Sequence, residues 1–179
     1  AGAPATACYQ EAIAAYRSVF DLAQAVQSES ERDLLYWISA NEATLALRGD
    51  WPADKCAAIA EWLDANTPTL DALRVATEYD CAAWPCETVP SNRLMWAVPV
   101  LQNAKLRTLS KLVGVCACQC ARAGNWSAAY AWSLRIQWMA AHVRLSPWPF
   151  FRANADAIAE FGCRQLRMLL AGDGRPDGL

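Results

Sequence analysis

Three cysteines at alternate positions are the most reactive-looking group of residues in the chain. Cys116, Cys118 and Cys120 lie in the stretch VGVCACQCAR, and thiolates are soft ligands for Cu(I) and Zn(II). Each residue of a helix advances by about 100°, so Cys116 and Cys120 share a face while Cys118 points about 160° away. One helix therefore cannot direct all three sulfurs at one metal ion. Cys116 and Cys120 are the candidates for a two-thiol metal or redox site.

The arrangement of Cys116 and Cys120 resembles the paired cysteines of four-helix copper-storage proteins. That resemblance implies further pairs on facing helices, where this chain offers only single cysteines. Small apolar residues in a core are the alternative interpretation of these thiols. We therefore assign no metal site and no cofactor.

The sequence contains no catalytic set. His142 is the only histidine, which excludes a site with several histidine ligands and makes a Ser-His-Asp arrangement depend on one ring near a helix end. A cationic imidazole at that end would also simply favour the helix dipole. Asp156 and Glu160 form a like-charge pair four residues apart, and there is neither a Gly-rich phosphate loop nor a CxxCH haem motif. We expect a protein that is not an enzyme.

The total of eight cysteines is high for a reduced cytosolic chain and favours an oxidising compartment. Cys81 and Cys86 are the disulfide candidate, because the stretch DCAAWPC lies where prolines prevent a continuous helix. The remaining three, Cys8, Cys56 and Cys163, lie on apolar helix faces, where a free cysteine serves as a small hydrophobe.

Nine tryptophans are many for 179 residues. Those expected inside helices, and hence in a core, are Trp37, Trp62, Trp132 and Trp138. Those expected at turns are Trp51, Trp84, Trp126 and Trp148. At a turn an indole can pack on a neighbouring repeat or take part in a protein interface, where aromatic residues dominate binding. The four turn tryptophans are therefore the interface candidates.

The small net charge of −2 conceals an imbalance between the two halves. Residues 1–91 hold 14 acids and 5 bases, a net charge of −9, whereas residues 92–179 hold 4 acids and 11 bases, a net charge of +7. The basic half could bind an anionic partner such as nucleic acid or lipid headgroups. We favour the other interpretation, in which the halves pack together with complementary charges, and we expect no nucleic-acid partner.

The composition predicts an all-α protein. Ala, Leu and Trp dominate, and β-branched residues never alternate over the length of a strand. No apolar run reaches about 18 residues without a charge, so no transmembrane segment is expected in the chain as given. The start, AGAPATA, suggests a flexible leader over residues 1–8 exposed after removal of an upstream segment, although excision of one Met would leave the same start.

The clearest structural pattern runs from Pro99 to Leu145, where two long helices are joined by a turn at residues 123–125. Gly124 supplies a left-handed residue that ends the first helix, and Asn125 or Ser127 can cap the second. On the first helix, the apolar residues expected to face the protein core are Leu101, Ala104, Leu109, Leu112, Val113, Cys116 and Cys120. The second helix has two apolar stripes: Ala131, Leu134, Trp138, Ala141 and Leu145, and Ala128, Trp132, Met139 and Val143. We expect it to be covered on two sides, as the middle helix of a stack.

Before this hairpin the pattern predicts four helices and after it one more. The first helix runs over 7–26, and the second starts with a capping box of Ser28 and Glu31. The third helix has Pro52 in its first turn. The fourth helix has Thr67 as its cap and extends to about residue 79. Residues 80–92 are irregular and divide portions 9–80 and 92–171 of one domain at 9–171. The last helix passes through Ile158 to Leu170, and residues 172–179 are expected to be disordered.

About seven helices with short connections predict antiparallel pairs, arranged as an α-solenoid or tetratricopeptide-like stack or as a compact bundle. The stretches ALRGDWPADKCAAIAEWL and ARAGNWSAAYAWSLRIQWM share the order Gly, polar residue, Trp and Ala-rich helix, 75 residues apart. This order is similar to the tetratricopeptide turn, without its full consensus.

Over residues 9–171 the chain resembles a family of bacterial helical-repeat proteins of unknown function. The resemblance lies in the order of helices and breaks and in Leu101, Arg107, Leu109, Leu112, Gly124, Ala128 and His142. It implies an N-terminal signal or membrane anchor, and hence a location outside the cytoplasm, either periplasmic or close to a membrane. It brings no catalytic residues, and the density of Trp and Cys departs from the family pattern.

These observations predict a non-enzymatic protein-interaction or scaffolding module, of the kind that serves as an accessory subunit of a larger assembly. Another protein or assembly is the expected partner. The alternative is a Cys-based copper, zinc or redox protein that uses Cys116 and Cys120.

Overall fold

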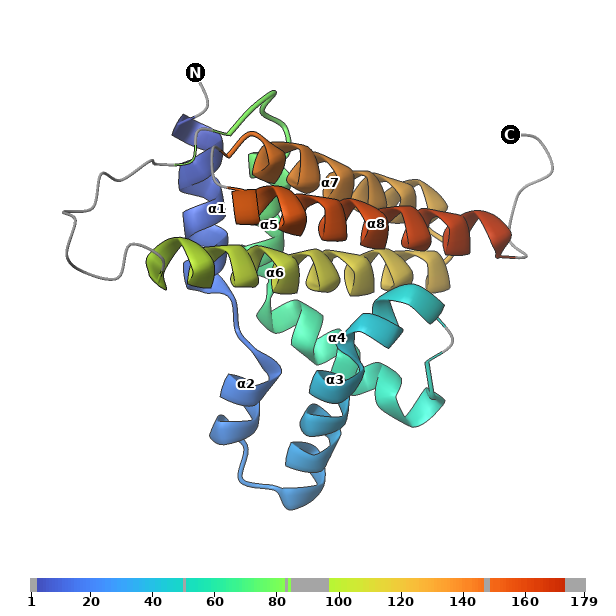
Figure 1. The fold of residues 1–179 in the computed structure, drawn as a ribbon. Helices are drawn as coiled ribbons and strands as arrows, with labels where there is room; N and C mark the ends of the chain where they lie inside the picture. Colours follow the sequence, from blue (N-terminus) through green and yellow to red (C-terminus); the bar gives the residue numbers. More distant parts are fainter. Residues whose placement is uncertain (1–2, 50, 83, 85–96, 147–148, 173–179) are drawn as a thin grey trace.

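A computed structural model describes residues 3–49, 51–82, 84, 97–146 and 149–172. The described residues form eight α-helices and one short 3-10 helix and contain no strand, so the all-α prediction is confirmed (Figure 1). The elements are α1 (Ala3–Ala15), α2 (Val19–Ala25), α3 (Glu29–Arg48), η1 (Ala53–Lys55), α4 (Cys56–Ala65), α5 (Thr67–Ala76), α6 (Ala97–Arg122), α7 (Trp126–Arg144) and α8 (Pro149–Ala171).

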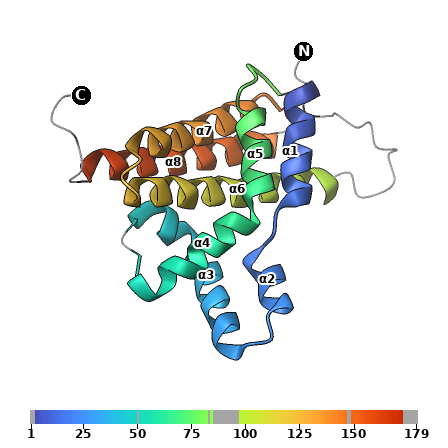
Figure 2. The ribbon, with the colours of Figure 1, turned by 180° about the vertical axis from the view of Figure 1, so that it is seen from behind.

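Three long helices, α6, α7 and α8, lie side by side and alternate in direction along the chain (Figures 1 and 2). The paired helices α1 and α5 cross one end of this layer, and seen from behind they lie in front of it (Figure 2). Helices α2, α3 and α4 extend below the layer, with α3 packed on α6. The helices thus form antiparallel pairs around α6.

The turn between α6 and α7 forms as its residues predict. Gly124 has a φ of 75°, its amide donates to the Ala121 carbonyl oxygen at 2.9 Å, and the Asn125 amide donates to that of Cys120 at 2.9 Å. The Asn125 side chain then caps α7 by accepting a hydrogen bond from the Ala128 amide at 3.1 Å. A left-handed glycine and an N-cap, adjacent in the sequence, thereby fix the hairpin.

The predicted first helix over 7–26 is wrong, because the chain breaks at residues 16–18 and forms α1 and α2. The capping box predicted at Ser28 lacks its side-chain bond, whereas Ser18 and Asp21 form a complete one at the start of α2. Buried Asn66 stabilises the break: its side chain accepts from the Arg17 amide at 2.9 Å and donates to the Arg17 carbonyl oxygen at 3.0 Å. Local propensity was overridden by a distant side chain.

Other boundaries differ by a few residues. Helix α1 begins at Ala3, so residues 3–8 are helical where a leader was expected. Pro52 precedes η1, and α4 begins only at Cys56. Asn66 rather than Thr67 is the cap position of α5, which ends at Ala76 rather than near residue 79. Within the tail expected to be disordered, residues 173–179 lie outside the described residues.

Helices α3, α6 and α8 lie close together at Gly114. A Cβ atom at that position would lie 2.8 Å from the Ala46 Cβ atom and 3.0 Å from the Phe161 ring. Beside it the fully buried Gln165 donates to the carbonyl oxygens of Ala46, at 3.2 Å, and of Gly114. Its side-chain oxygen accepts from the Ser133 hydroxyl of α7 at 3.3 Å. One amide therefore links four helices.

Candidate functional site

The outer face of α7 carries a row of exposed apolar side chains, here called the α7 stripe: Ala131, Leu134, Trp138, Ala141 and Leu145. The three large members are 51 % (Leu134), 48 % (Trp138) and 58 % (Leu145) exposed. The steps between members are three, four, three and four residues, which is the spacing of a helix seam that packs against another helix. The sequence predicted that this stripe would be covered; among the described residues nothing covers it.

The rest of α7 is anchored to its neighbours. Buried residues of the opposite faces pack α7 against α6 and α8: Ala129, Ser133, Ile136, Met139, Ala140, His142 and Val143. Of the second predicted stripe, Met139 and Val143 are buried and Trp132 is half-buried. The stripe is therefore held on a rigid support rather than on a mobile loop.

Arginines flank the α7 stripe on both sides. On the α5 side the Arg135 guanidinium donates to the Thr77 hydroxyl at 2.9 Å and to the Arg74 carbonyl oxygen at 3.1 Å, with Glu78 4.0 Å away. On the α8 side Arg144 pairs with Asp156. Both edges of the apolar row thus carry a fixed guanidinium group.

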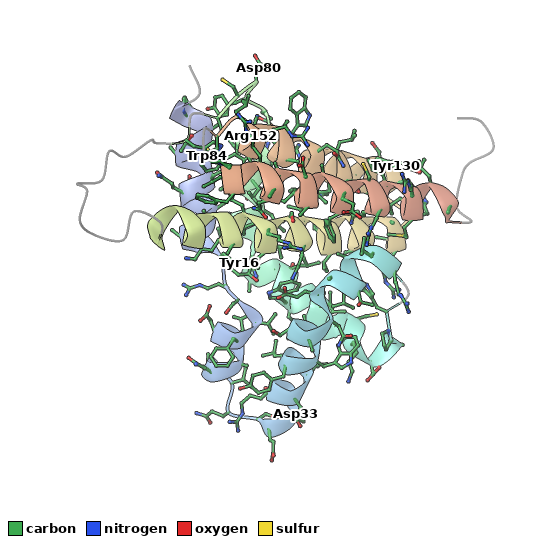
Figure 3. All side chains as sticks on the ribbon, viewed as in Figure 1. Tyr16, Asp33, Asp80, Trp84, Tyr130 and Arg152 are labelled. Atoms are coloured by element: carbon green, nitrogen blue, oxygen red, sulfur yellow. The ribbon has the colours of Figure 1, made fainter. Side chains whose placement is uncertain are left out.

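A buried polar cluster fixes the C-terminal end of α7. The His142 Nε2 atom lies 2.9 Å from the Tyr79 carbonyl oxygen, which can only accept, so Nε2 carries the proton and donates. The Nδ1 atom then accepts from the Tyr9 hydroxyl at 2.9 Å. The Trp84 indole N–H donates to the His142 carbonyl oxygen at 2.7 Å and stacks on Tyr9, with ring centroids 5.4 Å apart. Figure 3 shows Trp84 and Asp80 at this end of the molecule and Tyr130 toward the other.

The environment of His142 favours the neutral ring. Burial lowers its pKa, and the hydrogen bond to Tyr79 and the charge of Asp80 only partly oppose this shift. The ring is fully buried, and both of its nitrogens are hydrogen-bonded to described residues. Among the described residues, these contacts hold the C-terminal end of α7 in place.

The three cysteines of α6 diverge as the helix geometry predicts. The Cys118 thiol is buried and donates to the Ala46 carbonyl oxygen at 3.3 Å, and burial raises its pKa to about 11. Cys116 and Cys120 are half-buried on another face. A hydrogen bond from the Cys116 thiol lowers the pKa of Cys120 to about 7, and the same bond, with burial, raises the pKa of Cys116. Among the described residues no group of three His, Cys, Asp or Glu side chains could hold a metal ion.

The disulfide candidate falls partly outside the described residues. Cys81 is half-buried, and Cys86 is not described. Their pairing stays a prediction.

Of the tryptophans predicted to lie in the core, Trp62 is buried, and Trp37 and Trp132 are half-buried against the core. Trp51 and Trp84 are buried, and their indole N–H groups donate to carbonyl oxygens near helix ends, that of Trp51 to Leu45 at 2.8 Å. Trp126 is half-buried beside Tyr130, and Trp148 lies outside the described residues. Trp138, assigned to the core, is instead exposed at the centre of the α7 stripe. The regular three- and four-residue spacing around Trp138 identified the stripe but not whether another helix covers it.

The comparisons with known proteins identify no relative: no family model, curated protein or solved structure matches the chain. The described residues also contain no helix long and apolar enough to cross a membrane.

Proposed function

We propose that the protein is a non-enzymatic interaction module that binds an amphipathic helix of another protein along the α7 stripe. The observation that carries this proposal is the exposed apolar row at helix-seam spacing on a helix whose other faces are buried. An amphipathic helix is recognised through anchors spaced by three and four residues. A contiguous exposed apolar row on an otherwise polar surface commonly marks an interaction site.

The flanks of the stripe specify the chemistry of the partner helix. Arg135 and Arg144 stand on opposite sides of the apolar row. A partner helix with acidic residues beside its apolar seam would place carboxylates near both guanidinium groups, and charge complementarity governs specificity and association rate. The expected partner is therefore an apolar-faced helix with acidic flanks.

A second copy of the chain fits the stripe less well. Each flank carries both signs, because Glu78 stands beside Arg135 and Asp156 beside Arg144, so two copies packed through α7 would gain no net charge complementarity. A stable dimer also buries about 800 Å² on each partner, whereas a fully buried aromatic side chain contributes about 150–250 Å². Three half-exposed large side chains fall short of this area by themselves, so any partner must also contact side chains beside the stripe.

Binding should be tested with natively isolated protein and a variant that carries Leu134→Ser and Trp138→Ser. The matched control is Leu170→Ser, which removes a side chain that is similarly exposed on α8. We expect a partner to be recovered with the wild type and the control but lost with the double variant, and its cross-linked segment to be an acidic amphipathic helix. A strictly monomeric wild type without a partner, or a partner retained by the double variant, contradicts the proposal.

The helical-repeat interpretation is part of the same proposal. Its support is that the two similar stretches end their first helices in the same way: Gly49 has a φ of 67° and Gly124 a φ of 75°. The two turns are neighbours, since the Arg122 guanidinium donates to the Gly49 carbonyl oxygen at 2.9 Å. A tetratricopeptide-like accessory subunit of a bacterial assembly outside the cytoplasm would agree with the family resemblance and with the number of cysteines.

A second candidate function rests on Cys116 and Cys120, which lie four residues apart on one half-buried face of α6. Two thiolates can hold Cu(I) in linear two-coordination, and soft sulfur ligands select this ion. Titration with Cu(I) against a chromogenic chelator would test the site, with Cys116→Ser and Cys120→Ser as variants and exposed Cys163→Ser as the control. One tightly held ion that only the first two variants release supports the candidate. Equal affinity in all four proteins eliminates it.

A further inference from the structure

A surface cavity of about 310 Å³ lies between α3, α6 and α8, away from the α7 stripe. The helices lie close together at Gly114, and the cavity opens one to two turns earlier on α6, at Arg107 and Lys111. Alanines of α3 and α8 keep the walls open, and Leu47 and Phe161 provide an apolar side. The volume is that of a small-molecule site.

The charges around the cavity do not cancel. Its lining carries three cationic side chains, Arg107, Lys111 and Arg164, and one carboxylate, Glu160, which pairs with Arg164. Lys111 has only the carboxylate of Glu42, at 3.9 Å, which is long for a charge-assisted hydrogen bond. Arg107 has no ion pair or side-chain hydrogen bond with any described residue. Within the described part of the chain, one positive charge therefore faces the cavity without a partner.

The geometry limits the kind of anion that fits. Arg107 and Lys111 are four residues apart, so they are neighbours on one face of α6 and can hold one anionic group between them. A phosphate dianion would be repelled by Glu42 and Glu160 nearby, and these helices present their sides rather than an N-terminus to the cavity. A monoanion matches the single uncompensated charge.

We propose that this cavity binds a small organic carboxylate with an apolar body. Arg107 and Lys111 hold the carboxylate, and the apolar part packs against Leu47 and Phe161. This site is separate from the proposed helix-binding surface, so failure of one proposal leaves the other standing.

The test is an NMR titration of ¹⁵N-labelled protein with 4-phenylbutyrate, its neutral amide and inorganic phosphate. We expect 4-phenylbutyrate to shift amide signals around Arg107, Lys111 and Phe161, and the amide and phosphate to bind at least tenfold more weakly. Equal binding of the neutral amide, shifts confined to other residues, or no saturable shift with 4-phenylbutyrate would overturn the proposal.

Two variants test the charge and the free volume of the cavity separately. Arg107→Gln removes the unpaired charge, and Ala43→Leu fills the cavity; each should weaken binding of 4-phenylbutyrate at least tenfold. Arg32→Gln is the matched control, because it removes an exposed arginine near the start of α3 that does not line the cavity, and its affinity should stay within twofold of the wild type. Unchanged affinity in Arg107→Gln refutes the assignment of the carboxylate to this residue.

Discussion

Helices α6 and α7 are joined by one turn and are similarly rich in apolar residues, but their neighbours differ. Helix α6 contacts α3, α7 and α8, and its buried residues extend around its axis, from Leu106 and Leu109 to Val115 and Cys118. Helix α7 packs mainly on α6 and α8 and leaves Leu134 exposed. An apolar circumference shows that a helix requires several neighbours; it does not show that one chain supplies them all.

The largest expected difference between α6 and α7 is in the free energy of unfolding lost when a matched leucine in each helix is truncated. Leu112→Ala in α6 should lower the free energy of unfolding by about 2–5 kcal/mol, because Leu112 is fully buried and its loss leaves a cavity. Leu134→Ala in α7 should change it by less than about 1 kcal/mol. Urea denaturation of both variants measures the difference. Similar losses in the two would show that α7 is covered in solution.

Removing the side-chain amide of Gln165, which is hydrogen-bonded to both α6 and α7, should have the next largest effect on the free energy of unfolding. Gln165→Leu leaves the Ser133 hydroxyl without its acceptor and removes the bonds to α3 and α6, at a cost of about 1–3 kcal/mol. A double-mutant cycle with Ser133→Ala measures the coupling between the two side chains, since the second substitution removes the stranded hydroxyl. Strictly additive losses would mean that the Ser133 to Gln165 bond contributes nothing.

The end of α7 should be sensitive to pH through His142. Its pKa is lowered by burial in the folded protein, so the unfolded chain, with a pKa near 6.5, binds the proton more readily. The stabilisation is full above about pH 6.5 and is lost as the pH falls from there through the folded pKa, by at most about 1.4 kcal/mol per pH unit. Denaturation curves of the wild type and His142→Gln between pH 5 and 8 should diverge accordingly. Parallel curves would exclude His142 as the source.

The smallest effect concerns thiol reactivity on the partly open face of α6. With a pKa of about 7, Cys120 should be alkylated at neutral pH roughly tenfold faster than an ordinary thiol of similar exposure. Cys116→Ser replaces the weak S–H donor by a stronger O–H donor, so Cys120 should stay reactive, whereas Cys116→Ala should slow its alkylation. Mass spectrometry of iodoacetamide-labelled peptides gives the rates. An unchanged rate in Cys116→Ala would show that the bond between the thiols is unimportant.

Predictions from the sequence succeeded where the determining residues are close together in the chain. Gly124 and Asn125 set the turn between α6 and α7, and helix periodicity placed Cys118 opposite Cys116 and Cys120. Both depend on backbone geometry within a few residues. The all-α class likewise follows from the composition and from the lack of alternating β-branched residues, and does not depend on distant contacts.

Predictions failed where a distant group decides the outcome. The break between α1 and α2 depends on Asn66, which is 49 residues from its partner Arg17. The burial of Trp51 and Trp84 depends on carbonyl oxygens near helix ends that accept their indole N–H groups. The carbonyl oxygen that accepts from Trp84 belongs to His142, which is 58 residues away in the sequence. The exposure of the α7 stripe depends on which helices pack around α7, and no local pattern contains that information.

The position of Trp138 also gives the protein an optical reporter. Among the described tryptophans Trp138 alone is exposed, while the others are buried or half-buried. Its indole should therefore fluoresce at longer wavelength than theirs and be the most accessible to a quencher such as iodide. A helix that settles on α7 would shift this emission to the blue and protect it, so occupancy of the surface can be followed without any added label.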